Sequence, residues 1–178
     1  MRYFKKIIGE RIYLSPINTE DVEIYTKWLN DIEVCESLGS YALQLTLDAE
    51  KKWLEEFSSK NHNYAIVLHD GDKMIGNIGF LEIDNISRIG TVGLFIGDKE
   101  CHNHGYGTEA LKLILGYAFK TLNLHNVMLF VHSNNERGIA CYKKVGFKEM
   151  GRRREAKFVN GEYVDVVFMD ILASEFLS

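Results

Sequence analysis

The sequence lacks the features that mark secreted, membrane-spanning or multi-domain chains. Its 178 residues include a single proline, Pro16, and three cysteines, Cys35, Cys101 and Cys141, with no Cys-x-x-Cys pair. An odd number of widely spaced cysteines disfavours a disulfide framework and a thiolate zinc site. No uncharged apolar run is long enough to span a bilayer, and the N-terminus meets charge too early for a secretory leader. These absences predict a soluble, unprocessed, cytoplasmic protein with reduced thiols.

The chain also has little excess charge of either sign. It carries 21 Lys+Arg against 25 Asp+Glu, a formal net charge of −4. This mild acidity argues against a protein that wraps nucleic acid, because such proteins neutralise phosphates with clustered Lys and Arg. No linker, repeat or low-complexity segment interrupts the sequence, so we expect one domain over residues 1–178.

Hydrophobic periodicity predicts an α+β order of elements. A hydroxyl cap at Thr19 opens the first helix, and the second helix carries Trp53 on its apolar face. Gly146 ends a later helix as a C′ glycine, and Asn160-Gly161 is a strong hairpin signal. The expected elements are a strand over 11–15, helices opening at 19 and 46, a hairpin of 64–68 and 74–83, a strand over 88–96, a helix over 108–122, a strand over 127–131, a helix over 137–144, and a closing hairpin of 156–158 and 163–171.

A glycine-containing turn, His102 to Thr108, lies between a predicted strand and the most amphipathic predicted helix. The start of a helix leaves backbone N–H groups without intrahelical partners and adds partial positive charge. Gly105 and Gly107 allow close approach of a phosphate, so a pyrophosphate is the natural ligand. A tight turn with no ligand is the alternative interpretation. The third glycine of a Rossmann fingerprint and the Gly-Lys-Ser/Thr of a Walker motif are both missing.

Two segments together resemble a known family. Gly93-Leu94-Phe95-Ile96-Gly97, followed by His102-Asn103-His104-Gly105-Tyr106-Gly107-Thr108-Glu109-Ala110, resembles the acetyl-CoA signature of the GNAT superfamily of N-acetyltransferases. The run from Asn135 to Phe147, with Ile139, Tyr142 and Gly146, resembles its second signature. The two ends of the chain resemble the branch of ribosomal-protein-alanine and spermidine acetyltransferases, so the likeness covers nearly the whole chain. The residues that carry this are Gly9-Glu10-Arg11 and Trp28-Leu29-Asn30-Asp31 at the start, and Gly151-Arg152-Arg153-Arg154-Glu155-Ala156, Asn160-Gly161, Tyr163 and Asp165 at the end.

The resemblance implies a fold and an activity. The implied fold is a mixed, mostly antiparallel, twisted sheet with a splayed central parallel strand pair, flanked by helices on both faces. The implied reaction transfers the acetyl group of acetyl-CoA to a primary amine by direct attack in a ternary complex. The amine is a protein N-terminus or a small amine such as a polyamine or amino-sugar. No metal, nucleic acid or membrane is implied, and a homodimer is allowed.

The resemblance also assigns roles to residues. Tyr142 would protonate the departing sulfur, since its phenol has a pKa near that of a coenzyme thiol. Asn135 would hydrogen-bond the cofactor arm or cap the next helix. The expected cofactor-binding residues are Leu94, Phe95, Ile96, His102, Asn103, His104, Gly105, Tyr106, Gly107, Thr108, Asn135, Gly138 and Tyr142.

The general base is not assigned by the resemblance. Thr91 stands where this branch often has a glutamate that activates the amine, and a threonine cannot be that base. Glu82, on the neighbouring predicted strand, could address the same cleft through a water and is our catalytic candidate. His132 and the hairpin residues Glu155 and Asp165 are further candidates, and solvent alone is another.

Other interpretations remain open. Thr91 suggests a catalytically silent acetyl-CoA-binding module, and the glycine turn alone would fit a nucleotide-binding regulator. The cluster of Cys101, His102 and His104 lacks a remote fourth metal ligand, so we expect no metal site. Cys141 is interpreted as a packed side chain, and the run from Arg152 to Arg154 as a strand with solvated ends.

Overall fold

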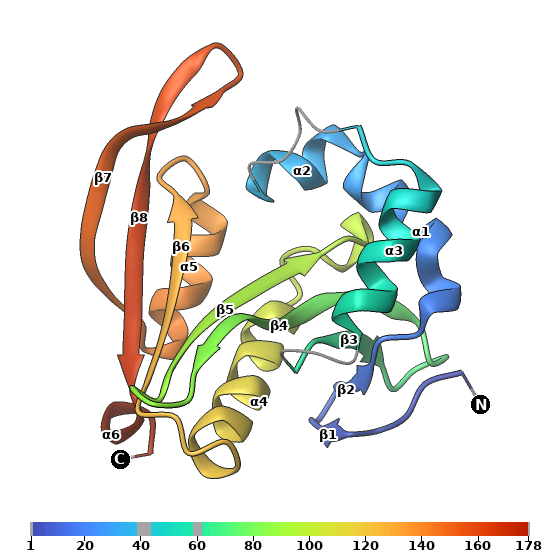
Figure 1. Cartoon of the computed structure of the whole chain (residues 1–178), viewed down its shortest axis with the longest axis horizontal. Helices are drawn as coiled ribbons and strands as arrows, with labels where there is room; N and C mark the ends of the chain where they lie inside the picture. Colours follow the sequence, from blue (N-terminus) through green and yellow to red (C-terminus); the bar gives the residue numbers. More distant parts are fainter. Residues whose placement is uncertain (1, 39–43, 59–61, 178) are drawn as a thin grey trace.

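The computed structural model describes residues 2–38, 44–58 and 62–177, and these form one eight-stranded sheet with helices on both faces (Figure 1). The strands are β1 (Ile7–Ile8), β2 (Ile12–Pro16), β3 (Tyr64–Leu68), β4 (Met74–Asp84), β5 (Ile89–Ile96), β6 (Asn126–His132), β7 (Lys148–Val159) and β8 (Glu162–Leu172). The helices are α1 (Val22–Leu29), α2 (Ile32–Leu38), α3 (Leu47–Phe57), α4 (Tyr106–Lys120), α5 (Glu136–Val145) and α6 (Ala173–Phe176), with short 3-10 turns η1 (Thr19–Asp21) and η2 (Lys99–Cys101).

The sheet is antiparallel except at its centre. Its strand order is β1-β2-β3-β4-β5-β6-β8-β7, and within the described part of the chain only β5 and β6 pair in parallel, joined through α4. The hairpin of β7 and β8 closes at Asn160 and Gly161, which both have positive φ values, 50° and 87°. Gly146 ends α5 with a φ of 115°. The α+β class and the β-α-β unit predicted from the sequence are confirmed.

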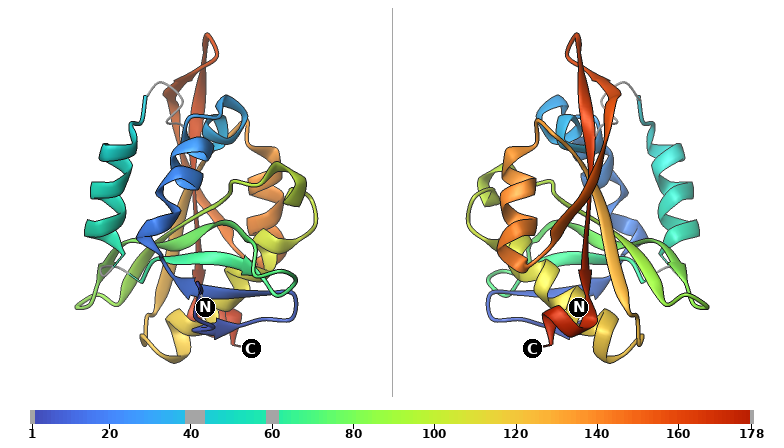
Figure 2. Two further views of the ribbon diagram at one scale, coloured as in Figure 1. Left: turned by 90° about the vertical axis from the view of Figure 1, so that its right-hand side faces the viewer. Right: turned by 90° about the vertical axis from the view of Figure 1, so that its left-hand side faces the viewer.

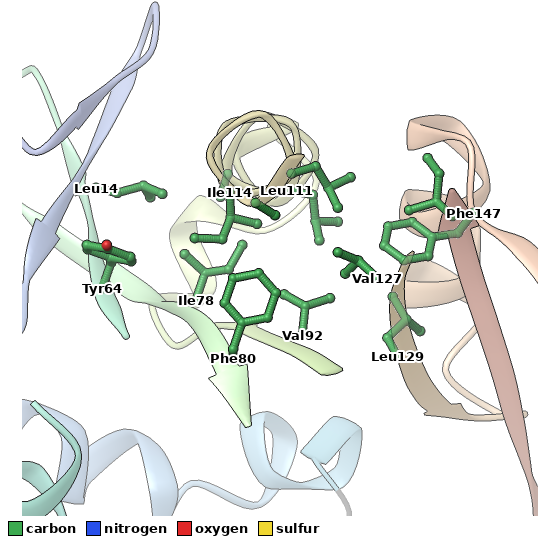
Figure 3. Close-up of a cluster of buried hydrophobic side chains, with 14 of the residues drawn as sticks. Leu14, Tyr64, Ile78, Phe80, Val92, Leu111, Ile114, Val127, Leu129 and Phe147 are labelled. Carbon is green, nitrogen blue, oxygen red and sulfur yellow. The ribbon is translucent and has the colours of Figure 1, made fainter. Parts of the chain in front are cut away.

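Two apolar layers cover the two faces of the sheet. Figure 2 shows α3 and α5 on opposite sides of it. The larger core packs α4 residues, Leu111 and Ile114 among them, onto Phe80 of β4 and Val127 of β6 (Figure 3). The second core lies on the opposite face and includes Tyr25 of α1. Alternate residues of one strand therefore serve different layers, as the pleat of a strand requires.

The N-terminal helices depart from the sequence prediction. The cap is Asn18 rather than Thr19, because the Asn18 side chain accepts the Glu20 N–H at 3.0 Å and residues 19–21 form a 3-10 turn. Asp21 is fully buried and binds Arg2 and Tyr3 instead of facing solvent. Helix α2, which the sequence analysis did not predict, follows α1 directly.

Helix α3 begins at its predicted cap but buries a different face. Thr46 accepts the Ala49 N–H at 3.2 Å, as a hydroxyl cap should. Among its residues whose side chains the structure describes, Leu54 and Glu50 are buried, whereas Trp53 is 39% exposed. The expected apolar face with Trp53 is therefore wrong. The large indole of Trp53 determined the apolar face that the sequence predicted. In the structure the neighbouring Leu54 packs in the second core instead.

Candidate active site

The central parallel pair separates after only three residues. β5 and β6 are in register from Ile89 opposite Asn126 to Thr91 opposite Met128, and no further pairing of these strands occurs in the described residues. Beyond Thr91, the edge of β5 that faces β6 has backbone groups without a strand partner. Backbone N–H and C=O groups need partners, so this edge can pair with an extended ligand. The splayed pair predicted from the resemblance is confirmed.

The loop after β5 leads into the N-terminus of α4. Gly105 is the N-cap residue with a φ of 81°, a left-handed conformation that glycine adopts without strain. The first N–H groups of this 15-residue helix, from Tyr106 to Thr108, have no intrahelical partners. Together with the helix dipole they form an anion site of the kind that holds phosphates.

One cavity joins the open strand edge to this loop. Its volume is about 600 Å³. Twelve of the thirteen cofactor-binding residues expected from the sequence line it, and the exception is His104. Its walls come from β5, the loop before α4, α4 itself and α5. They are formed by Leu94, Phe95, Ile96, Cys101, His102, Asn103, Gly105, Tyr106, Gly107, Thr108, Asn135, Glu136, Arg137, Gly138, Ala140, Cys141, Tyr142 and Lys144.

The two histidines of the loop, His102 and His104, differ from the expectation that both bind the cofactor. The His102 N–H already donates to Lys99 O at 3.1 Å, so it is not a free phosphate donor. Its ring bridges two elements, with Nε2 2.9 Å from Ile96 O and Nδ1 2.8 Å from Arg137 Nη1. Because arginine can only donate, Nδ1 must accept and Nε2 must carry the proton. The His104 side chain is exposed and lies outside the cavity.

Tyr142 faces the cavity from α5 and packs edge-to-face on Phe147, with ring centroids 6.1 Å apart. Burial raises the pKa of Tyr142 to about 12, and the neighbouring Cys141 adds to the rise. The phenol is therefore protonated at neutral pH and can donate a proton. Burial also raises the pKa of the Cys141 thiol, whose Sγ lies 3.3 Å from Thr108 Oγ1. A protonated, packed thiol fits a structural role for Cys141.

Asn135 begins α5 at the edge of the same cavity. Its Oδ1 accepts the Gly138 N–H at 2.8 Å, so it caps the helix. A Cβ at position 138 would lie 2.8 Å from Asn135 Nδ2, and glycine there makes room for the cap. The Asn135 Nδ2 has no hydrogen-bond partner among the described residues, which leaves its two N–H donors for a ligand.

Glu82 does not line the cavity, but the strand geometry brings it beside Thr91. A β-bulge between Phe80 and Glu82 shifts the register, so that Glu82 is directly opposite Thr91. In such a bulge both bulged side chains lie on the side of the opposing residue, here the face away from α4. Cross-strand neighbours have Cβ atoms about 5 Å apart. The exposed Glu82 carboxylate is therefore next to the threonine that replaces the usual glutamate.

The other candidate bases lie farther along the sheet. His132 is buried, its Nδ1 has no hydrogen-bond partner in the described part of the chain, and burial, with Lys157 adding, lowers its pKa. Asp165 Oδ1 accepts the N–H of Glu155 at 2.9 Å, where β7 bulges. Neither His132, Asp165 nor Glu155 lines the cavity.

The sequence analysis missed two basic groups on the cavity wall. Arg137 and Lys144 of α5 line the cavity together with Cys141. The spacing of positions 137, 141 and 144 is i, i+4, i+7, which places them on one helix face, and this signal was readable. Two cations beside the N-terminus of α4 suit a ligand with several negative charges.

A carboxylate on α4 ties the loop to the start of the sheet. Glu109 Oε1 accepts the Arg11 N–H at 2.9 Å, and Oε2 accepts Arg11 Nε at 2.9 Å. Arg11 Nη1 also donates to His104 O at 2.8 Å, and the guanidinium lies 4.8 Å from the Tyr106 ring centroid. Burial alone raises the pKa of Glu109, but the hydrogen bonds from Arg11 outweigh it and hold the pKa below its usual value. We call Arg11 and Glu109 the loop clamp.

Metal-binding clusters and membrane-spanning helices are both absent from the described residues. No three of their His, Cys, Asp or Glu side chains gather as metal ligands do. None of the described helices is long and apolar enough to cross a membrane.

The open strand edge, the anion site and the buried phenol define a class of protein, a transferase that holds an extended, phosphorylated acyl carrier. Comparison with known proteins agrees. A family model for the acetyltransferase (GNAT) domain matches residues 11–148. The chain belongs to the GNAT acetyltransferase family and is an N-acetyltransferase with acetyl-CoA as its co-substrate.

Similar proteins are named either as ribosomal N-acetyltransferases or as spermidine N-acetyltransferases. A putative ribosomal N-acetyltransferase of Bacillus subtilis is 30% identical over 84% of this chain and 78% of its own. A spermidine N(1)-acetyltransferase of Vibrio cholerae is 35% identical over 70% of this chain and 75% of its own. The crystal structure of spermidine N-acetyltransferase from Vibrio cholerae with CoA and spermine aligns with a TM-score of 0.85 at 25% identity, covering 96% of this chain and all of that one.

Proposed function

We propose that this protein acetylates a primary amine, a protein N-terminus or a small amine, by direct attack on the thioester within a ternary complex. The observation that carries the proposal is the gap between β5 and β6, which opens next to a cavity that holds Tyr142. Relatives that are named for spermidine or for ribosomal substrates support an amine acceptor. Its three free cysteines support a cytoplasmic location.

Different residues of the chain would bind different parts of acetyl-CoA. Acetyl-CoA supplies an activated acetyl group when bound. The first N–H groups of α4 would hold its pyrophosphate, and Arg137 and Lys144 would add positive charge. The unpaired edge of β5 and the Asn135 amide would hold its extended arm. Such positioning of two reactants accounts for much of the rate of a transfer between them.

Two side chains would move protons. Tyr142 stays protonated because of its raised pKa, so it can supply a proton to the departing sulfur. Glu82 would take the proton of the ammonium, directly or through a water, from its place opposite Thr91. An alkyl ammonium has a pKa of about 10 and must lose its proton before it can attack.

A second candidate function, a catalytically silent acetyl-CoA-binding module, is favoured by Thr91. The two candidates differ in one measurement. Purified protein with acetyl-CoA and an amine panel, including a peptide beginning with Ala or Ser, spermidine and simple alkylamines, should release CoA thiol above the hydrolysis background. Binding of acetyl-CoA without amine-dependent release would identify the silent module instead.

The role of Glu82 has its own test. Glu82→Gln should lower kcat at pH 7 by about 100-fold, within the usual range for loss of a general base. The defect should shrink as pH rises toward 10, because more of the amine is then free of its proton. Glu23→Gln, on the exposed side of α1, is the matched control and should behave as wild type. A Glu82→Gln variant with an unchanged rate at pH 7 would remove Glu82 from the mechanism.

A further inference from the structure

Two half-exposed apolar side chains flank the gap on the face of the sheet away from α4. Phe130 of β6 is 50% exposed, and its neighbours Leu129 and Val131 are buried against the α4 layer. Because side chains alternate along a strand, Phe130 points to the other face. Leu81 of β4 is 52% exposed on that same face. An acceptor amine that meets the acetyl group through the gap must approach across this face.

The β4 bulge and a glycine place Leu81 beside the gap. Leu81 is the extra residue between Phe80 opposite Val92 and Glu82 opposite Thr91. A Cβ at Gly93 would lie 3.4 Å from Leu81 Cδ2, so the leucine lies over Gly93 on β5. Bulges commonly reorient a side chain next to an active site. Leu81 and Phe130 thus border the open part of the β5 and β6 pair from its two sides.

The same face offers one available carboxylate near the gap. Glu82 is exposed beside Thr91, whereas Asp170 accepts a hydrogen bond from Asn126 at 2.8 Å. The acidic residues of α2 line a hollow that adjoins the cofactor cavity and shares Asn135, Glu136 and Arg137 with it, and both have partners. Glu33 pairs with Lys99 at 3.0 Å, and Glu36 accepts from Asn160 at 2.7 Å. Beside Leu81 and Phe130 themselves, Glu82 is the available carboxylate among the described residues, and the further acids belong to the adjoining hollow lined by α2.

We propose that the preferred acceptor is a primary amine attached to an apolar or aromatic group. The group would cover Leu81 and Phe130, and the amine would reach the gap beside Glu82. This inference rests on the proposed function and names the substrate class of the same site. Burial of apolar surface favours such an acceptor over a hydrophilic amine of equal basicity.

The test measures kcat/KM for ethylamine, 2-phenylethylamine and spermidine with wild type and variants. We expect wild type to prefer 2-phenylethylamine to ethylamine by at least about tenfold, a usual ratio for an apolar contact of this size. Phe130→Ser and Leu81→Ser should each reduce that ratio toward one while the KM for acetyl-CoA stays within about twofold. Ile86→Ser, at a 95% exposed position on the β4–β5 turn, is the matched control and should keep the preference.

Each other outcome overturns a defined claim. Spermidine as the best substrate, with turnover unaffected by Phe130→Ser and Leu81→Ser, overturns the apolar acceptor and leaves the proposed function standing. A wild-type dimer that Phe130→Ser dissociates would show that a second copy covers this face, which also overturns the inference. No CoA release with any amine, despite acetyl-CoA binding, overturns the proposed function itself.

Discussion

At the scale of single residues, the surroundings of Tyr142 decide how it can act. A free tyrosine has a pKa of about 10 and begins to lose its proton in mildly alkaline solution. Burial raises the pKa of Tyr142 to about 12. A group with a raised pKa keeps its proton up to that higher value and loses it only as pH rises through it. Tyr142 therefore remains a proton donor wherever the acceptor amine becomes deprotonated.

The first prediction follows from this pKa. Tyr142→Phe removes only the hydroxyl and should lower kcat by about 100-fold, with acetyl-CoA affinity nearly unchanged. In wild type, kcat should show no alkaline loss between pH 7 and 10. A pH–rate series on both proteins, with acetyl-CoA affinity measured by calorimetry, checks it. An equal rate for the variant would remove Tyr142 from the mechanism, and a fall near pH 9 in wild type would contradict the raised pKa.

The position of the loop from Gly105 to Thr108 was predictable because glycine and helix-start patterns have direct physical meaning, whereas Tyr142 was proposed from the family resemblance. Both line the cavity, and their roles stay predictions. The bulge that brings Leu81 and Glu82 to one face was not predictable. A bulge is a one-residue difference in register between two strands, and neither strand shows it alone.

At the scale of elements, the loop clamp holds the cofactor loop from outside the cavity. Arg11, at the start of β2, contacts His104 and Tyr106 but no residue of the clamp is on the cavity wall. Its contacts fix the loop whose N–H groups we propose as the pyrophosphate site. Loss of such a contact weakens binding more than chemistry, because the ligand must then order the loop.

The second prediction concerns this clamp. Arg11→Met should raise the KM for acetyl-CoA about tenfold and leave kcat within about twofold, since charge-assisted hydrogen bonds are worth about 1.5 kcal/mol or more. Arg152→Met is a matched control, because Arg152 pairs with Glu149 on the distant edge strand β7. Steady-state kinetics at saturating amine provides the measurement. An unchanged KM with a lower kcat would show that Arg11 does not act through the loop.

Helices and strands with a long hydrophobic pattern were predictable from the sequence, and short ones were not. Helix α4 and the Asn160-Gly161 hairpin have long periodic flanks, and the structure contains both. Helix α2 is seven residues long and was missed, since two turns give too few apolar repeats. The buried face of α3 depended on which side of the helix met the sheet, a tertiary property that Trp53 concealed.

At the scale of the whole molecule, ligand binding should stabilise the fold. A ligand at about 100 times its Kd adds about 2.7 kcal/mol to the free energy of unfolding. For a chain of this size that corresponds to a rise in Tm of about 5–10 °C. Thermal unfolding with acetyl-CoA, and with ATP or NAD as controls, measures it. A rise with ATP or NAD and none with acetyl-CoA would favour the nucleotide-binding regulator instead.

The loop clamp also makes the loop before α4 depend on a distant part of the chain. Arg11 and Glu109 are 98 positions apart in the chain, so their contact closes a very large loop. Closing a loop of that length has an entropic cost that the native contacts around it must offset. The geometry of the loop before α4 therefore depends on the docking of β2, because Arg11 contacts the loop from there. A chain in which β2 has not docked would lack the contacts of Arg11 with Glu109 and His104, and we expect it to bind acetyl-CoA more weakly.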